Sequence, residues 1–286
     1  MIWSTLAGKF EQAKILDPVV EGVAGLVNTV LPRGTLKDAL HGTWLGHQLH
    51  PMLIAGPIGL WSSALVLDWT GGDRDAARRL VGAGVLAVAP TAASGLADWS
   101  ELGSAKRPKR VGLVHAVANT GTAVLFGASW LARRRGDHDR GRTLALAGAG
   151  GLAVGGYLGG HLSYAQGVGV NRNADEQKEP RDWTDAAAAA DVVEGAPHRV
   201  EVKGQSIVLV RSQGQVRAIG ATCSHWGAPL EEGSLVQDGG SCLECPWHGS
   251  RFRLQDGSVA RGPATSAQLS YDVQTVGERL QVRVRT

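Results

Sequence analysis

Four residues near the C-terminus have the types and the spacing of a metal site. Cys223 and His225 form a C-x-H motif, and Cys245 and His248 form a C-x-x-H motif after nineteen intervening residues. All three cysteines of the chain lie between residues 223 and 245, and an odd number in so short a segment argues against a disulfide framework. Two thiolates with two imidazoles suit either a zinc ion or an iron–sulfur cluster.

The residues around both motifs resemble the Rieske family of [2Fe–2S] proteins over roughly residues 190–286. The matching segments are GAPL at 227–230, CPWHGS at 245–250 and RGPA at 261–264. This resemblance implies that the two cysteines hold one iron and the two histidines hold the other, which gives potentials of about −150 to +300 mV. It also implies that Trp247, Ser250 and Pro263 surround the cluster, with Pro263 in a covering loop. Zinc sites rarely have the C-x-H spacing, which favours the cluster.

Three positions indicate the branch of the family. Rieske proteins of cytochrome bc complexes carry an extra cysteine in each loop, joined as a disulfide, and this chain has Ala228 and Trp247 at these positions. The resemblance is therefore to the disulfide-free, ferredoxin-like branch that is shared with oxygenase components. Phe252 stands where high-potential members have a tyrosine. Because a hydroxyl near the cluster raises its potential, we predict an intermediate or low potential within the Rieske range.

The elements expected to hold these motifs are short strands. From residue 198 onward, apolar residues recur with a period of two and glycines separate the runs. Short strands with regular turn signals are typical of a small antiparallel β domain. The cluster motifs therefore fall in loops of an all-β Rieske domain at residues 190–286.

The preceding part of the chain has the composition of a membrane domain. Four runs carry almost no charge, at residues 51–67, 80–97, 111–132 and 143–165. A membrane-spanning helix needs about 20 apolar residues, so the runs predict an all-α four-helix transmembrane bundle at residues 41–165. A soluble bundle rich in Ala and Gly is the alternative.

Two further segments complete the expected organisation. Residues 1–40 have apolar positions at helical spacing, interrupted by charges, which predicts an amphipathic N-terminal segment. Residues 166–189 begin with a polar stretch and predict a linker. The segments GHQLHPML at 46–53 and GPIGLW at 56–61 resemble an uncharacterised family of four-helix membrane domains with an H-P-M-L-type motif, some of them fused to Rieske domains. That resemblance implies an architecture and no activity.

Four histidines are predicted at one membrane face of the bundle. His47 and His50 stand at the start of the first helix, His115 at the start of the third, and His161 near the end of the fourth. Successive helices alternate in direction, so these ends share a face, from which the chain continues to the Rieske domain. Ionisable groups in membrane segments are functional candidates. Haem b, a non-haem metal and a quinol site are all open, as are ordinary interfacial hydrogen bonds.

The sequence predicts a membrane-anchored electron carrier. The cluster would pass single electrons between a soluble or membrane redox partner and a membrane cofactor or quinone. The alternatives are a quinol-linked or haem-containing membrane oxidoreductase that uses the histidines, and a redox-sensing or anchoring module. No P-loop and no G-x-G-x-x-G after a predicted strand is present, so a partner would have to supply a nucleotide cofactor.

The charge of the chain bears on its binding partners and on its orientation in the membrane. The net charge of +3 gives no reason to expect nucleic acid. Lysines and arginines divide about evenly between the two membrane faces, so they do not decide the orientation. Because iron–sulfur clusters are assembled in the cytoplasm, we expect the Rieske domain on the cytoplasmic face of a bacterial plasma membrane.

Overall fold

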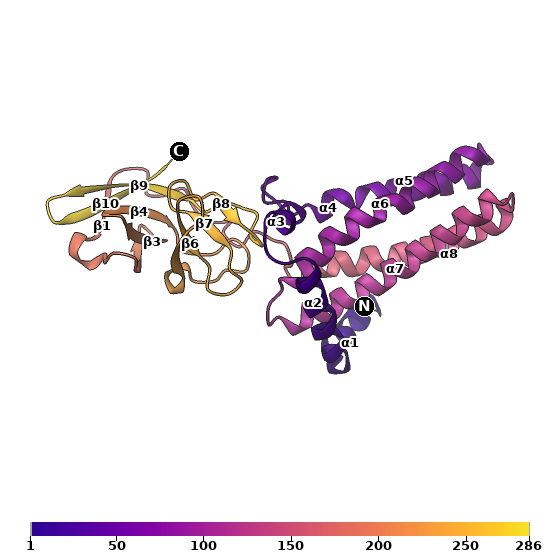
Figure 1. Cartoon of the computed structure of the whole chain (residues 1–286), viewed down its shortest axis with the longest axis horizontal. Helices are drawn as coiled ribbons and strands as arrows, with labels where there is room; N and C mark the ends of the chain where they lie inside the picture. The colour runs from indigo at the N-terminus through magenta and orange to yellow at the C-terminus, as the bar shows by residue number, and fades with distance from the viewer. Residues whose placement is uncertain (1, 286) are drawn as a thin grey trace. The chain divides into compact units, whose positions relative to one another are not determined.

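The computed structural model describes residues 2–285 and contains two compact units. The helical unit comprises Met1–Pro32 and Leu49–Val168, and the β unit comprises Arg33–Gln48 and Gly169–Thr286 (Figure 1). The β unit is therefore assembled from two stretches of chain that flank the long helices in the sequence.

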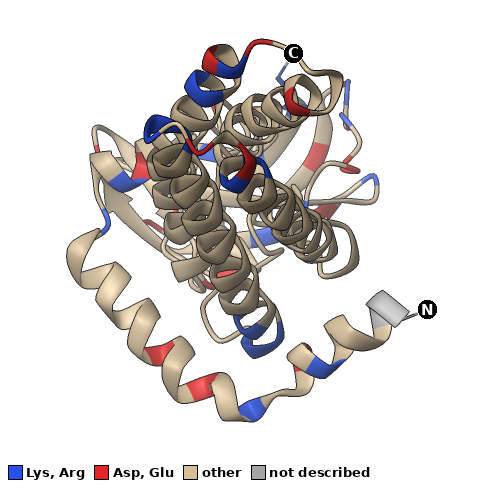
Figure 2. Ribbon diagram, turned by 90° about the vertical axis from the view of Figure 1, so that its right-hand side faces the viewer, with Lys and Arg blue, Asp and Glu red and all other residues tan. Residues whose placement is uncertain are grey.

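Four long apolar helical segments make up most of the helical unit. They are His50–Thr70, formed by α4 (His50–Leu53) and α5 (Ala55–Thr70), then α6 (Arg74–Ser100), α7 (Lys106–Arg134), and α8 (His138–Gly160) continued by the π-helical turn His161–Ala165. Each segment is long and apolar enough to cross a membrane. In Figure 2 the middle parts of these helices are mostly tan, and the blue and red charged residues gather near the helix ends. The predicted four-helix class is confirmed.

Small residues allow α7 and α8 to pack closely. A Cβ atom at Gly151 would lie 2.3 Å from Thr122 Oγ1, and one at Gly155 would lie 2.3 Å from Asn119 Oδ1. At Gly159 the nearest atom is Cε1 of His115, 3.1 Å away. Glycines at spacing four thus form a flat stripe against which the polar side chains of α7 lie, as expected for helices that approach closely in a membrane.

The N-terminal helices α1 (Ile2–Gln12) and α2 (Asp17–Val30), separated by the turn Lys14–Leu16, are held to α7 by ion pairs. Glu11 Oε2 accepts from Arg107 Nε at 3.0 Å, and Asp17 accepts two hydrogen bonds from Arg110 at 2.6 and 2.8 Å. Burial of Glu11 opposes its ionisation, but hydrogen bonds from His161 and Arg107 outweigh this and lower its pKa to about 2. These contacts fix the amphipathic segment to one end of the helices.

The β unit contains two antiparallel sheets. The six-stranded sheet has the order β1-β10-β9-β4-β3-β2, and the four-stranded sheet has the order β5-β6-β7-β8. The strands are β1 (Thr184–Ala188), β2 (Pro197–Val202), β3 (Gln205–Ser212), β4 (Gln215–Gly220), β5 (Ser234–Gln237), β6 (Ser241–Glu244), β7 (Arg251–Arg253), β8 (Val259–Arg261), β9 (Ser270–Val276) and β10 (Arg279–Val284). The predicted all-β class is confirmed.

Strand β3 explains the uninterrupted apolar run at residues 207–210. Val208 and Val210 pack in one hydrophobic cluster with Cys223 and Cys245, whereas Ile207 and Leu209 pack in a second cluster. Successive side chains of a strand point to opposite faces, so a strand buried on both faces is apolar at every position. One strand thereby links the cysteine-bearing loops to the rest of the fold.

Two stretches join the β unit through partners that are distant in the sequence. Strand β1 covers most of the alanine run at 186–190 and pairs with β10, with Ala187 opposite Leu280. Helix α3 (Thr35–His41) lies in the N-terminal segment and yet belongs to the β unit. Both arrangements depend on partners far away in the sequence, which local composition does not reveal.

Candidate iron–sulfur site

Two loops carry the C-x-H and C-x-x-H motifs, and backbone pairing closes each loop at its base. The first loop follows β4 and is closed by an antiparallel bridge between Thr222 and Pro229. The second loop joins β6 to β7, where Glu244 pairs with Arg251. Strand pairing therefore fixes where each motif begins and ends.

The two loops have the same backbone hydrogen-bond pattern. In each, the cysteine N–H donates to the carbonyl five residues later, and the N–H of a glycine four residues later donates back to the cysteine carbonyl. The distances are 2.9 Å for Cys223 to Ala228, 2.8 Å for Gly227 to Cys223, 2.8 Å for Cys245 to Ser250 and 3.0 Å for Gly249 to Cys245. Both glycines have positive φ, +75° and +71°, which L side chains rarely adopt. The sequence spacing differs only in the histidine, which comes second after one cysteine and third after the other.

The two thiols are buried and hydrogen-bonded to each other. Backbone N–H groups of His225 and Trp226 point at the sulfur of Cys223, and those of Trp247 and His248 point at the sulfur of Cys245. The hydrogen bond from Cys223 lowers the pKa of Cys245 to about 7, whereas that same hydrogen bond and burial raise the pKa of Cys223. Four amide donors thus stabilise negative sulfur, and the thiolate is the form that binds iron.

The two imidazoles form a second pair. The rings of His225 and His248 lie 4.9 Å apart at an interplanar angle of 87°, and both Nδ1 atoms are buried. The donors are arranged as two thiols and two imidazoles. A Rieske cluster needs one such pair for each iron, so this donor set fits the cluster.

A third loop is hydrogen-bonded to both cluster loops. The backbone N–H of Ala264 donates to Ser250 Oγ at 2.9 Å, and Ser224 Oγ donates to the Ser266 carbonyl at 2.7 Å. Pro263 lies in this loop, and Ser250 is fully buried. Because Ser250 accepts the bond from Ala264, its own proton remains available for another acceptor.

Three side chains near the motifs have different environments. Trp247 is 54% exposed and lies beside His248, with ring centres 6.5 Å apart, so it forms part of the surface of the site. Phe252 is fully buried in the cluster of apolar residues that contains both motif cysteines. Cys242 is buried within β6, outside both motif loops.

The membrane histidines come together only in part. The His50 and His115 rings lie 6.5 Å apart at 77°. Nδ1 of His50 lies 3.0 Å from the Thr91 carbonyl, and Nδ1 of His115 lies 2.9 Å from the Gly155 carbonyl. Asn119 Nδ2 also lies 3.1 Å from His115 Nε2. Two imidazoles from different membrane segments therefore meet inside the helical unit.

The other two histidines of that predicted set have different partners. Nε2 of His161 lies 2.8 Å from Glu11 Oε1, so this histidine joins the ion-pair network of the N-terminal helices. His47 belongs to the β unit and is exposed, with its Nδ1 3.0 Å from the Gln48 carbonyl. In the sequence, Glu11 is one of the charges that interrupt the apolar positions of residues 1–40. Its ion-pair partners are about 100 and 150 residues away, so local pattern does not indicate this role.

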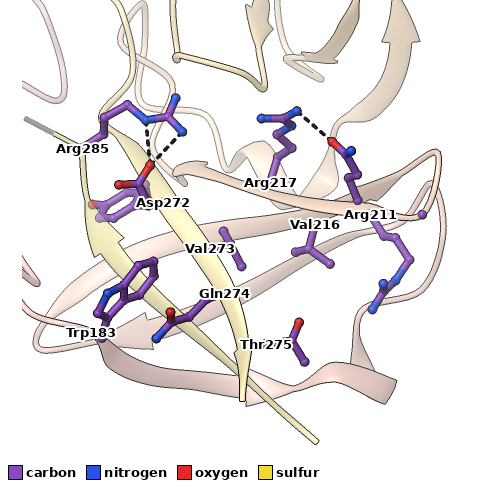
Figure 3. A pocket seen from close by; sticks show the side chains of 12 residues that line it. Trp183, Arg211, Val216, Arg217, Asp272, Val273, Gln274, Thr275 and Arg285 are labelled. Carbon is purple, nitrogen blue, oxygen red and sulfur yellow. Dashed lines mark hydrogen bonds and ion pairs between the residues drawn. The ribbon is translucent and has the colours of Figure 1, made fainter. Parts of the chain in front are cut away.

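A separate hollow of about 580 Å³ lies on the six-stranded sheet (Figure 3). Trp183, Arg217 and Arg285 are among its lining residues, which include none of the four motif residues. Its arginines are engaged locally, since Arg217 donates to Gln215 at 2.9 Å and Arg285 pairs with Asp272 at 2.9 Å. The hollow is therefore distinct from the candidate cluster site.

Comparison with known proteins gives two family matches. Residues 182–276 match the Rieske [2Fe-2S] domain family, and residues 46–172 match the family described as Predicted membrane protein (DUF2231). The ferredoxin component of the naphthalene 1,2-dioxygenase system of Pseudomonas aeruginosa is 31% identical over 100 residues, which cover 35% of this chain and 93% of that protein. This chain belongs to the Rieske family.

Other relatives are similar over a comparable length. The ferredoxin subunit of 3-phenylpropionate/cinnamic acid dioxygenase from Escherichia coli is 36% identical over 92 residues, 32% of this chain and 84% of the subunit. Human Apoptosis-inducing factor 3 is 31% identical over 106 residues, which cover 36% of this chain and only 17% of that protein. The solved ferredoxin of carbazole 1,9a-dioxygenase from Nocardioides aromaticivorans is 28% identical with a TM-score of 0.34, covering 36% of this chain and 98% of that one.

These matches bear out the coarse functional prediction. The chain contains a Rieske domain that is similar to ferredoxin components of dioxygenase systems and whose family implies a [2Fe–2S] cluster, and this domain is joined to a predicted membrane domain.

Proposed function

We propose that the protein is a membrane-anchored ferredoxin, with a cluster bound by Cys223, His225, Cys245 and His248. The observation that carries this proposal is the arrangement of the four side chains as a thiol pair and an imidazole pair on two matching loops. A bound cluster would supply reversible one-electron chemistry. The amide groups of the loops favour thiolate sulfur, and the surrounding apolar residues exclude water from it.

The exposed part of the site supports an exit for the electron beside His248. His225 is buried, whereas His248 is half-buried and its neighbour Trp247 is 54% exposed. A large exposed aromatic residue next to a ligand is the kind of side chain that anchors protein interfaces. We therefore place the contact with redox partners at Pro246, Trp247 and His248.

We propose that the partner is an oxidoreductase at the membrane. The relatives named above include ferredoxin components of dioxygenase systems, and a ferredoxin component of this chain's kind would pass its electron to an oxidoreductase. The four apolar helical segments would hold this carrier at the bilayer, with the β unit on the cytoplasmic side of a bacterial plasma membrane, where clusters are assembled. Anchoring confines carrier and partner to one surface, which raises their effective concentration.

The ligand assignment is tested by electron paramagnetic resonance of the reduced, detergent-purified protein. The unmodified chain should give a Rieske signal, and His248→Ala should abolish it while the helical content is unchanged. His198→Ala, which removes a histidine from strand β2 of the same unit, is the matched control and should keep the signal. A full Rieske signal in His248→Ala would refute the assignment.

We also propose where any second redox cofactor of the helical unit binds. His50 and His115 meet inside this unit, and their Nδ1 atoms lie at hydrogen-bonding distance from backbone carbonyls. Such bonds favour the tautomer whose Nε2 can bind a metal, as in a haem b with two histidine ligands, and at His115 the metal would have to displace Asn119 Nδ2, which lies 3.1 Å from that nitrogen. A reduced-minus-oxidised optical spectrum should then show sharp haem bands that are lost in His115→Ala. Iron–sulfur absorption alone in the unmodified protein would remove haem from the proposal.

A further inference from the structure

A segment that precedes the first long helix packs on the loop that contains Pro263. Helix α3 (Thr35–His41) places the carboxylate of Asp38 at this loop, where Oδ1 accepts a hydrogen bond from the Gly262 N–H at 2.9 Å. Oδ2 of the same carboxylate lies 4.0 Å from Nε of Arg261. The Asp38 side chain is 17% exposed, so this hydrogen bond is largely shielded from water. All of these residues belong to the β unit.

The contact extends along the loop. A Cβ atom at Gly262 would lie 3.1 Å from Cδ2 of His41 and 3.4 Å from Cγ2 of Thr43, so glycine allows this close approach. At the other end of the loop, Ser266 Oγ donates to the Gly46 carbonyl at 3.2 Å. Residues 38–46 therefore hold both ends of the segment 262–266.

A chain of hydrogen bonds connects Asp38 to the second cluster loop. Asp38 holds Gly262, and two residues later the Ala264 N–H donates to Ser250 Oγ at 2.9 Å. The Ser250 carbonyl in turn accepts from the Cys245 N–H at 2.8 Å. The stretch that matches the Rieske family is 182–276, so Asp38 lies outside it.

We propose that Asp38 is a positioning residue for the cluster. Its carboxylate fixes the Gly262–Pro263 turn, which sets the orientation of the Ser250 hydroxyl and the cover over the two cluster loops. This inference rests on the proposed function, because it takes the cluster to lie between those loops. A second effect follows from charge: a carboxylate near the cluster disfavours an added electron and lowers the potential.

The two effects can be separated with two substitutions. Asp38→Asn removes the charge but keeps an oxygen that can accept from the Gly262 N–H, whereas Asp38→Ala removes both. Asp185→Ala is the matched control, because it also removes a carboxylate from the β unit, at an ion pair with Arg279 between β1 and β10. All three variants are made in the full chain and loaded with cluster.

Three quantities are measured: the electron paramagnetic resonance line shape, the midpoint potential, and the half-life of the cluster in the presence of an iron chelator. A hydrogen bond to a charged group contributes enough that its loss should shorten the half-life in Asp38→Ala by about tenfold. The same variant should have an altered line shape. Asp38→Asn should keep the line shape and stay within about twofold of the original half-life, with a higher potential.

The outcomes that overturn the proposal are distinct from those that overturn the ligand assignment. Identical behaviour of Asp38→Ala and Asp185→Ala in all three measurements would show that Asp38 does not position the cluster. An equal loss of half-life in Asp38→Asn and Asp38→Ala would assign the effect to charge and also overturn positioning through the hydrogen bond. The ligand assignment is judged separately, by the signal of the unmodified chain and of His248→Ala.

Discussion

The protein contains two pairs of imidazole rings in edge-on contact, one in each unit. In the β unit, His225 and His248 lie 4.9 Å apart, and the loops that carry them also bring two thiols together. In the helical unit, His50 and His115 lie 6.5 Å apart, and backbone carbonyls and Asn119 surround their ring nitrogens. The different surroundings of the two pairs indicate that a pair of histidines does not define a redox site by itself. The set of donors that accompanies the pair decides which cofactor can be held.

The two regions also differ in what maintains their geometry. The cluster loops depend on glycines with positive φ and on backbone bonds that return to the cysteine. The helical unit depends on regular helices, on glycines that allow close packing, and on ion pairs at its N-terminal helices. Four predictions test this contrast, from the largest expected effect to the smallest.

The largest effect is expected from removing one histidine of each pair. His225→Ala should abolish the Rieske signal, because one iron loses half of its imidazole ligands, whereas His115→Ala should keep it in full. Spin quantification per polypeptide in the reduced protein measures both. A loss of the Rieske signal in His115→Ala would break the contrast, since it would make the helical pair necessary for the cluster.

The second prediction concerns Glu11, whose pKa is lowered from 4.5 to about 2. A carboxyl with a lowered pKa stabilises the folded state above its unfolded pKa, and this contribution is lost as the pH falls from about 4.5 to about 2. Glu11→Gln should therefore lower the free energy of unfolding by roughly 1–3 kcal/mol at neutral pH. This is less than the full pKa shift would give, because the partner Arg107 is 72% exposed and solvent screens the ion pair.

Thermal unfolding of the detergent-purified protein at several pH values measures this difference. The gap between the unmodified chain and Glu11→Gln should be constant above about pH 5 and should close toward pH 2. Glu278→Gln, at an exposed position in the turn between β9 and β10, is the control and should show no gap. A gap for Glu11→Gln that does not change with pH would mean that its ionisation contributes nothing.

The third prediction compares one glycine from each region. Gly227 has φ +75° and only an ordinary contact with Arg172 Cβ at 3.9 Å, so Gly227→Ala should destabilise the β unit by about 1–2 kcal/mol through backbone strain. A Cβ at Gly59 in α5 would meet no atom within 4 Å, so Gly59→Ala should be neutral or stabilise its helix by up to about 1 kcal/mol. Melting followed by visible cluster absorption and by helical circular dichroism reports the two units. Equal effects in both variants would contradict the contrast.

The smallest effect is expected for Phe252→Tyr. Phe252 is fully buried in the hydrophobic cluster that contains Cys223 and Cys245, so we expect an added hydroxyl to find a thiolate sulfur as its acceptor. A new hydrogen bond to sulfur should raise the midpoint potential by about 20–60 mV, the equivalent of one ordinary hydrogen bond. A redox titration measures the shift. Trp247→Phe, at the exposed edge, should leave the potential close to its original value; a potential that falls in Phe252→Tyr would argue against sulfur as the acceptor.

Local patterns in the sequence were enough to predict much of this protein. The change from long apolar runs to alternation of period two separated four helical segments from short strands, because the two periods reflect local backbone geometry. The motifs themselves specified the candidate donors, since thiolates and imidazoles at these spacings are chemically distinctive. The glycine stripe of α8 is also a local feature, since side-chain volume at fixed helical spacing depends only on the residues of one helix.

Tertiary structure decided the features that depend on distant partners. In the structure His50 lies beside His115, whereas His161 lies at hydrogen-bonding distance from Glu11. The packing of the helices decides which of these side chains are neighbours. It also places Asp38 on Gly262, 224 residues away, and pairs an alanine run with β10. Such contacts form when separate elements pack against one another, and neither periodicity nor motif spacing encodes the partner. The sequence by itself thus determined the candidate donors and the classes of element, whereas packing determined which side chains surround those candidates.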